Sequence, residues 1–501
     1  MTAVPTSQEL TSGRRLTLSV FWNVVGLVLP MVVAVFAIPL LITGMGKERF
    51  GLLAIIWMGV GYFSLFDFGL GRALTKLVSE RLGSGDLTKL GPLIWTGLII
   101  LAGLGVLGGL LVWALAEPIV GSVLNVQLSL QSEAVTSFRL LAIGIPVVVL
   151  TSALIGLLEA YQRFGLIALV RVPLGVLTFA GPLLTIQYSP SLVWATLALL
   201  VSRFVACIAY FAAAAWTNKE LRRPTLPERS QIRPLVSFGG WQTVTNIVSP
   251  LMTYMDRFFV GAVLNLGAVA FYVAPYEAVS RISMLPAALM NVVFPAFSTA
   301  SAAGGARLSH IYADTCRLIG FAVLPVSAAL FLLAPEILRL WLGQEFAAAS
   351  ASVVKWLAIG LLVNTLAKAP FTVLQSIGRP DLVALTHLAE LVPYFLVLWF
   401  ATSSYGIAGT AFAWALRAGI DAAVLNEICG FKAPELRGSV RLTRIALICA
   451  VVGFSAVWSL PDVLIRILIL VCVCLFSALA LLPFVGRIAR TFSGSDALNK
   501  A

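Results

Sequence analysis

Ionisable side chains lie inside several long apolar runs of this chain, where a bilayer would hold them away from water. A charge at bilayer depth costs about 3 kcal/mol or more, so such residues usually face a partner or a watery cavity and are functional candidates by default. Arginine binds phosphate oxygens in pairs, so the bases suit an anionic ligand. The bases are Arg203, Arg257, Arg281, Lys368 and Arg417, and the acids are Asp67, Asp256, Glu277, Glu390 and Asp421.

Two acid and base pairs have helical spacing. Glu277 with Arg281, and Arg417 with Asp421, are four residues apart and therefore share one helix face, where they are able to pair. Such pairs either neutralise each other and lock helices together or meet a ligand, and both interpretations stay open for Arg281 and Arg417.

Three bases lack an obvious helical partner. Asp256 and Arg257 are adjacent, so their side chains diverge around the helix and are not expected to pair with each other. Arg257, together with Arg203 and Lys368, is therefore predicted to contact a substrate or to line a cavity.

Other residues suggest coupling or gating. His387 and Glu390 are three apart in one apolar run, and imidazole titrates near neutrality, so they form a candidate proton-responsive pair, with a simply hydrogen-bonded buried histidine as the alternative. Asp67 is a candidate ion-coupling acid, with a structural clamp as the alternative. Asp256, Glu277 and Asp421 belong to the same candidate set.

The elements that position these residues are membrane helices. The chain is 60% hydrophobic and 11% charged over 501 residues, whereas soluble proteins are about a quarter charged. Lipid cannot satisfy exposed backbone groups, and the runs lack the alternation of barrel strands, which predicts an all-α polytopic protein. Fourteen spans are expected, at about 18–42, 51–71, 91–116, 139–159, 165–186, 191–215, 235–263, 268–297, 317–342, 353–377, 382–402, 405–428, 442–460 and 463–485.

The basic residues that give the chain its formal charge of +12 indicate the orientation of these spans. Lysine and arginine cluster on alternate loops, which places both termini in the cytoplasm and argues against nucleic acid as the partner. The opening MTAVPTSQELTSGRR lacks a signal-peptide layout, so the first span is expected to be retained.

Other chemistries find little support. The six cysteines fall in spans or at their cytoplasmic ends, so neither a disulfide framework nor a metal site is expected. The GLGVLG of 103–108 lies inside an apolar helix and is interpreted as small-residue packing, and no Walker A motif supports ATP hydrolysis. We therefore expect no catalytic residues and no cofactor.

An internal repeat organises the spans. Residues 141–172 align with residues 357–388 at an offset of 216, sharing LAIG at the start and matching Arg163 with Arg379. We predict two six-helix lobes related by a parallel pseudo-twofold axis around a central cavity, plus two peripheral helices. The predicted divisions are 1–216 for the first lobe, 217–234 for a cytoplasmic linker, 235–430 for the second lobe, and 431–501 for the last two helices and a tail.

Three segments carry a family resemblance. They are ERFGLLAIIWMGVGYFSLFDFGLGRALTK, AFYVAPYEAVSRISMLPAALMNVVFPAFS, and LGQEFAAASASVVKWLAIGLLVNTLAKAPFTVLQSIGR with the later GIAGTAFAWAL. Over most of 14–430 the chain resembles the polysaccharide transporter, or Wzx-type, flippases, which share a superfamily with multidrug exporters and lipid II flippases.

The resemblance implies an activity. It implies movement of an undecaprenyl-pyrophosphate-linked oligosaccharide across the bacterial cytoplasmic membrane by alternating access, driven by a proton or sodium gradient or by membrane potential. A polysaccharide polymerase and a chain-length regulator are further implied partners. A multidrug exporter, a lipid II flippase and a non-transporting scaffold of polysaccharide assembly remain alternatives. No outer loop is long enough to house a catalytic domain.

Overall fold

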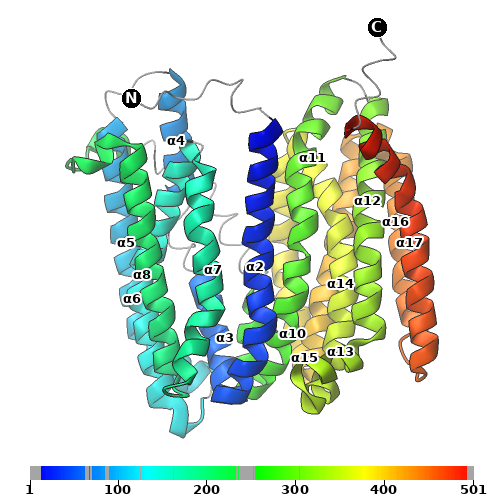
Figure 1. The fold of residues 1–501 in the computed structure, drawn as a ribbon, viewed down its shortest axis with the longest axis horizontal. Helices are drawn as coiled ribbons and strands as arrows, with labels where there is room; N and C mark the ends of the chain where they lie inside the picture. Colours follow the sequence, from blue (N-terminus) through cyan, green and yellow to red (C-terminus); the bar gives the residue numbers. More distant parts are fainter. Residues whose placement is uncertain are drawn as a thin grey trace. The chain divides into compact units, whose positions relative to one another are not determined.

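The computed structural model describes residues 13–62, 67, 70–84, 90–124, 126–161, 163–232, 235, 252, 254–303 and 305–492. Helices make up nearly all of this part of the chain, and it contains no β-strand, which confirms the all-α prediction (Figure 1). The chain forms two compact units, residues 1–270 and 271–501. Most of the start of the predicted seventh span, 236–251, lies outside the described residues.

The first unit is a helical bundle in which a short connecting segment follows α8. Its helices are α2 (Gly13–Met45), α3 (Lys47–Tyr62), α4 (Leu70–Ser84), α5 (Leu90–Pro118), the π-helical η2 (Ile119–Val123), α6 (Leu128–Ala160), α7 (Phe164–Ile186), α8 (Leu192–Thr217) and the 3₁₀-helical η3 (Lys219–Arg222). A further helical segment covers 254–263, and α10 (Leu266–Ile282) begins in this unit and continues into the second.

The second unit is also a helical bundle. Its remaining helices are α11 (Met284–Ala303), α12 (Gly305–Leu332), α13 (Ala334–Leu342), α14 (Gln344–Ser376), α15 (Pro380–Lys432), the 3₁₀-helical η4 (Pro434–Leu436), α16 (Arg437–Ala456) and α17 (Val463–Phe492).

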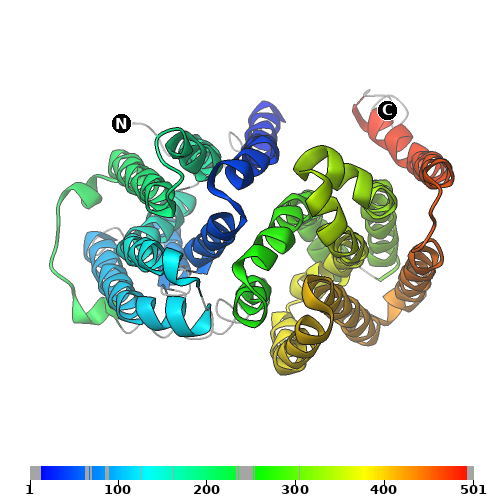
Figure 2. The same ribbon diagram turned by 90° about the horizontal axis from the view of Figure 1, so that it is seen from below.

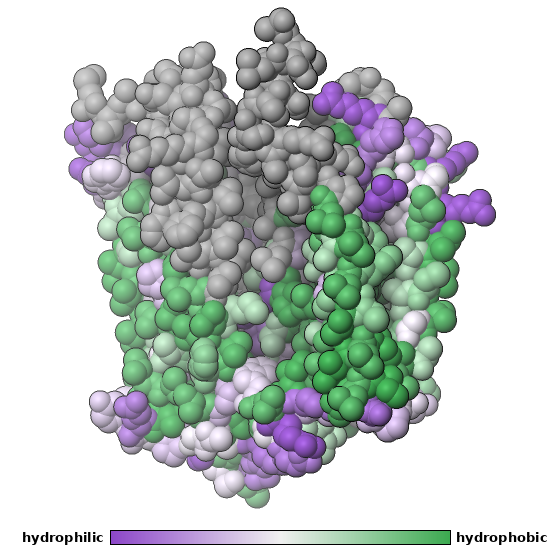
Figure 3. All heavy atoms as spheres, turned by 45° about the vertical axis from the view of Figure 1, so that its right-hand side comes forward, coloured by the Kyte–Doolittle hydropathy of each residue, from purple (hydrophilic) through white to green (hydrophobic). Residues whose placement is uncertain are grey.

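Long apolar helices make this a multi-pass membrane protein. Among the described residues, nine helices are long and apolar enough to cross a bilayer, so the predicted total of fourteen is not confirmed. In Figure 3, hydrophobic residues cover the sides of the helices, whereas hydrophilic residues gather at their ends. This distribution is the one expected of helices whose flanks meet lipid.

The predicted eleventh and twelfth spans form one element, α15, which folds sharply near its middle. Gly406 adopts φ 60° and ψ −146°, a conformation open to glycine but not to most side chains. Across this bend, the hydroxyls of Thr402 and Thr410 lie 2.9 Å apart in a hydrogen bond. We call this element the α15 hairpin, with arms 380–405 and 407–432.

Glycines allow α5 and α6 to approach closely. A Cβ atom added to Gly105 would lie 2.7 Å from the backbone of Pro146, and one added to Gly109 would lie 2.8 Å from the carbonyl oxygen of Ala142. The GLGVLG stretch therefore serves small-residue helix packing, as predicted.

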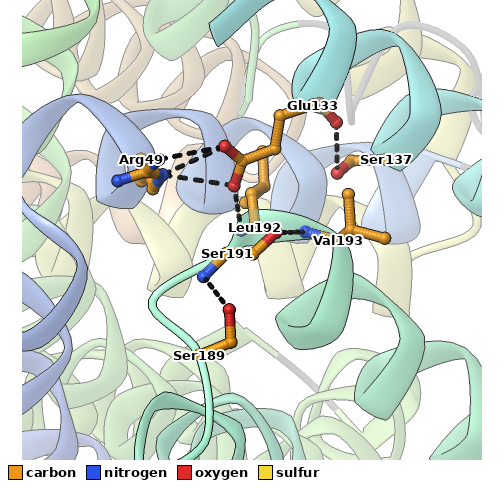
Figure 4. Close-up of polar contacts among 7 residues, drawn as sticks. All are labelled: Arg49, Glu133, Ser137, Ser189, Ser191, Leu192 and Val193. Carbon is orange, nitrogen blue, oxygen red and sulfur yellow. Dashed lines mark hydrogen bonds and ion pairs between the residues drawn. The ribbon is translucent and has the colours of Figure 1, made fainter.

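A carboxylate joins three helices at one end of the first unit (Figure 4). Glu133 of α6 accepts hydrogen bonds from Arg49 Nε of α3 at 3.2 and 3.1 Å, and from Arg49 Nη2 at 3.1 Å. The same carboxylate also accepts a bond from the backbone N–H of Leu192 in the first turn of α8. A charge at a helix N-terminus is favourable, so Glu133 acts as a structural clamp.

The last two helices, α16 and α17, are largely exposed and apolar, but polar contacts hold α17 and the loop before it to the rest of the second unit. Arg466 of α17 forms two hydrogen bonds with the carboxylate of Glu336, at 2.8 and 3.2 Å, and a third with the carbonyl oxygen of Leu332 at 2.8 Å. Lys355 donates to the carbonyl oxygen of Trp458 at 2.6 Å. Helix α17 therefore carries one buried charge that its apolar composition does not suggest.

Candidate functional site

Five of the predicted site residues come together in the second unit. Lys368 lies on α14, His387 and Glu390 lie on the first arm of the α15 hairpin, and Arg417 and Asp421 lie on the second arm. The fold at Gly406 sets the two arms against each other, which brings together residues about thirty positions apart in sequence. We call this group the α15 charge cluster.

The pairing inside the cluster differs from the spacing-based prediction. Nε2 of His387 lies 3.4 Å from Oδ1 of Asp421, across the hairpin, and the ring of Phe371 stacks on the imidazole at 6.2 Å between centroids. Asp421 thus pairs with His387 and not with Arg417, and His387 pairs with Asp421 and not with Glu390. The predictions treated each arm as an isolated helix, whereas the fold supplies a nearer partner from the opposite arm.

A cavity of about 460 Å³ opens between the two arms. Glu390, only 9% exposed, and Arg417 both line it, but neither carboxylate oxygen of Glu390 accepts a hydrogen bond. The guanidinium of Arg417 lies over the ring of Tyr394, 5.6 Å from its centroid. A mostly apolar wall, supplied by side chains such as Leu385 and Ile420, surrounds these polar groups.

The cluster is balanced in charge. Asp421 acts electrostatically on Lys368, and Arg417, His387 and Asp421 act on Glu390. With both acids ionised and the imidazole neutral, two positive and two negative charges cancel. One added proton would leave the cluster with a net charge of +1.

The predicted pair on α10 forms as expected. Nη2 of Arg281 lies 3.4 Å from Oε2 of Glu277, four residues before it on the same helix. The adjacent Tyr276 packs edge-on against Trp414, with ring centroids 6.0 Å apart, so this helix contacts the second arm of the hairpin three residues before Arg417.

The remaining predicted residues belong to the first unit. Asp256 and Arg257 are almost fully buried, and Oδ1 of Asp256 accepts the backbone N–H of Arg257 at 2.7 Å. The guanidinium of Arg257 lies 5.5 Å from the ring centroid of Tyr254. Asp67 is also buried, and it accepts a long hydrogen bond of 3.4 Å from Ser152 Oγ.

The sequence reasoning missed one base inside a predicted span. Arg203 lies on α8, and its Nε atom is buried without a hydrogen bond. Arg171 lies on α7, a helix that packs against α8. The signal was available in the sequence, because Arg171 interrupts the apolar run GLIALVRVPLG of the predicted fifth span.

No group of three or more histidine, cysteine, aspartate or glutamate side chains suited to a metal ion occurs within the described ranges.

Comparisons of fold identify the architecture. A multidrug resistance transporter of the MATE family and MOP superfamily, in an inward-facing conformation, matches 83% of this chain and 99% of its own, with 17% identity and a TM-score of 0.66. The lipid II flippase MurJ, in an inward closed conformation, matches 92% of this chain and 98% of its own, with 15% identity and a TM-score of 0.70. The two helical units thus form the fold shared by these transporters.

Comparisons of sequence identify the family. The chain is 30% identical to a protein named "Putative O-antigen transporter" from Shigella flexneri over 408 residues, which cover 81% of this chain and 95% of the relative. It is 26% identical to multidrug resistance protein PmpM of Pseudomonas aeruginosa over 240 residues, which cover 41% of this chain and 47% of the relative. The model of the family described as "Polysaccharide biosynthesis protein" matches residues 45–351. The chain therefore belongs to the polysaccharide biosynthesis protein family of membrane transporters.

Proposed function

We propose that this protein is a flippase that moves an undecaprenyl-pyrophosphate-linked oligosaccharide from the cytoplasmic to the outer leaflet of a bacterial inner membrane. The repeat unit of an O-antigen, a capsule or an exopolysaccharide is the cargo, and alternating access is the mechanism. Both termini lie in the cytoplasm, and a polymerase and a chain-length regulator act on the product. The protein catalyses no covalent step.

The observation that carries this proposal is the similarity to the Shigella relative, which extends over 95% of that protein. The match to the multidrug protein covers less than half of either chain, and the likeness to the lipid II flippase is one of fold. An oligosaccharide carrier is therefore favoured over a drug or lipid II as the transported molecule.

The predicted bases supply the anion-binding role in this proposal. Arg203, Arg257, Arg281, Lys368 and Arg417 bind the pyrophosphate or sugar during passage, because guanidinium and ammonium groups donate charge-assisted hydrogen bonds. Three of them, Arg281, Lys368 and Arg417, have an acid close by, so their strength as anion ligands depends on whether that acid is ionised.

The α15 charge cluster is the proposed coupling centre. Protonation of His387 or Glu390 would change the cluster from neutral to positive. The other predicted gating residues would contribute by a change in their own charge state. These residues are Asp67, Asp256, Glu277 and Asp421. Membrane potential offers a second driving force. Moving two negative charges outward across an inside-negative potential of about 100 mV would gain about 4.6 kcal/mol.

Reconstitution tests this function. Purified protein is placed in liposomes that contain a fluorescent undecaprenyl-pyrophosphate-linked oligosaccharide, and the fraction reached by an external quencher is followed. We expect fast exposure with the protein and slow exposure without it. A cationic dye and lipid II serve as parallel cargoes. Transport of either one, with none of the oligosaccharide, would refute the proposal, and transport of none would favour a scaffold role.

A further inference from the structure

Helices α12 and α16 of the second unit meet near both of their ends. Close to the start of each helix, the hydroxyls of Ser309 and Ser439 lie 3.1 Å apart in a hydrogen bond. Toward the other end of each helix, the rings of Phe331 and Phe454 pack with their centroids 4.8 Å apart. The two helices therefore run side by side in the same direction.

A cavity of about 300 Å³ lies between α12 and α16, and we call it the α12–α16 groove. Helix α14 contributes leucines to its lining, whereas α12 and α16 form its walls. Leu442 lines the groove and is 62% exposed, so the groove is open at the surface of the unit. Small residues on both walls leave this space, namely Ala313, Gly320, Ala446 and Ala450.

The groove lies on a part of the second unit that is suited to contact with lipid. Figure 2 views the helices end-on and shows α16 and α17 along the edge of this unit. Both helices expose many apolar side chains. Phe321 lines the groove, and Phe476 of α17 packs edge-on against it with ring centroids 5.5 Å apart. An apolar groove in such a surface is suited to a hydrocarbon chain.

The length of the groove matches one leaflet of a bilayer. Its lining positions on α16 extend from Ser439 to Ala450, which is about 16 Å at a rise of 1.5 Å per residue. The hydrocarbon core of a bilayer is about 30 Å thick, so this length is close to half of it. The groove can therefore hold one acyl chain of a lipid in one leaflet.

Two opposite charges lie at the groove. Arg317 lines it with a side chain that is 57% exposed, and Nη1 of Arg317 lies 3.9 Å from Oδ1 of Asp314. This distance is too long for a hydrogen bond, and exposed pairs of this kind contribute little to folding. Arg317 is also the first residue of the predicted span 317–342, which is the level at which lipid head groups lie.

We propose that the α12–α16 groove binds phosphatidylethanolamine as a resident lipid that is not transported. One acyl chain lies in the groove, the phosphate accepts hydrogen bonds from Arg317, and the ammonium group donates to Asp314. Phosphatidylglycerol lacks the positive group that Asp314 would meet, and the choline of phosphatidylcholine has no N–H donor. The geometry of the groove carries this assignment, which does not depend on the proposed function.

Lipid binding by the full-length protein tests the head-group assignment. The purified protein in detergent is titrated with phosphatidylethanolamine, phosphatidylglycerol and phosphatidylcholine of identical acyl chains, and bound lipid is counted by native mass spectrometry. We expect phosphatidylethanolamine to bind about tenfold more tightly than the other two, because it alone forms charge-assisted hydrogen bonds with both side chains. Its addition should also raise the unfolding temperature, because it binds the folded state.

Charge variants test the two head-group contacts. Arg317→Gln should weaken phosphatidylethanolamine binding about tenfold, because it removes the cation that faces the phosphate. Asp314→Asn should abolish the preference for phosphatidylethanolamine over phosphatidylglycerol, because it removes the charge that selects the ammonium group. Arg379→Gln is the control, since Arg379 forms an exposed pair with Asp381 in the same unit at 2.9 Å and does not line the groove.

A second pair of variants tests the acyl-chain contact. Ala446→Phe should fill the groove and weaken the binding of all three lipids about tenfold. Ala478→Phe is the matched control, because Ala478 is an exposed residue of α17 outside the groove, so the same substitution there should change nothing. Thermal unfolding of each variant identifies any that fail to fold.

The outcomes are distinct. Equal binding of the three lipids by the wild-type protein would overturn the proposal, as would unchanged lipid binding in a folded Ala446→Phe variant. Displacement of phosphatidylethanolamine by an equal amount of undecaprenyl phosphate would show that the groove belongs to the transport route and would overturn its assignment to a resident lipid. Failure of the proposed function would appear separately, as absent oligosaccharide transport by a wild-type protein that keeps these lipid preferences.

Discussion

Nε2 of His387 lies 3.4 Å from Oδ1 of Asp421, and this contact joins the two arms of the α15 hairpin. The imidazole is also stacked on Phe371, so both its position and its charge partner are defined.

The first prediction concerns the pH dependence of transport. We expect His387→Ala to flatten the change in oligosaccharide transport rate between pH 6 and pH 8, because it removes the imidazole of the α15 charge cluster. Transport in liposomes of defined internal and external pH is the measurement. His310→Ala is the control, because His310 is an exposed residue of α12. An equal effect of both variants would contradict the prediction.

The second prediction concerns Glu390 and Arg417. Arg417 lines the same cavity as the buried Glu390 and acts on it electrostatically, so Arg417→Leu leaves that carboxylate less compensated and should lower the free energy of unfolding by about 2 kcal/mol. Glu390→Gln added to Arg417→Leu should restore much of this loss, because the amide carries no charge. Thermal unfolding in detergent measures both variants. Equal losses in the single and double variants would show that the two side chains act independently.

The all-helical fold could be predicted from composition, because a long apolar run in a bilayer satisfies its backbone hydrogen bonds by forming a helix. The pairing of the charged residues could not be predicted in this way. Spacing along one helix correctly predicted the contact of Glu277 with Arg281, since both lie on α10. It failed for Asp421, whose partner His387 lies on the opposite arm. Helical periodicity describes positions on a single helix, so it does not predict contacts between residues on opposite sides of a sharp bend.

The grouping of site residues shows the same limit. All five members of the α15 charge cluster were identified from residue type within apolar runs, but their assembly depended on the bend at Gly406. Arg171 was overlooked, although it lies within a predicted span.

The third prediction concerns the Glu133 clamp. Glu133→Ala should lower the free energy of unfolding by about 3 kcal/mol, because it removes charge-assisted bonds to Arg49 and to the first turn of α8. Glu117→Ala is the control. Its pair with Arg139 is much more exposed, so the loss should stay below about 1 kcal/mol. Equal losses in thermal unfolding would show that the clamp contributes no more than a surface ion pair.

The fourth prediction concerns the bend that creates the α15 hairpin. A Cβ atom at Gly409 would lie 1.9 Å from the carbonyl oxygen of Ala401, so Gly409→Ala forces the arms apart. We expect a loss of about 3 kcal/mol in the free energy of unfolding, at the upper end of overpacking costs. Gly419→Ala is the matched control, since nothing lies within 4 Å of a Cβ atom there. Because the arms carry His387 and Asp421, Gly409→Ala should also alter the pH dependence of transport, whereas Gly419→Ala should not. Normal pH dependence in a folded Gly409→Ala variant would mean that the α15 charge cluster assembles without the bend.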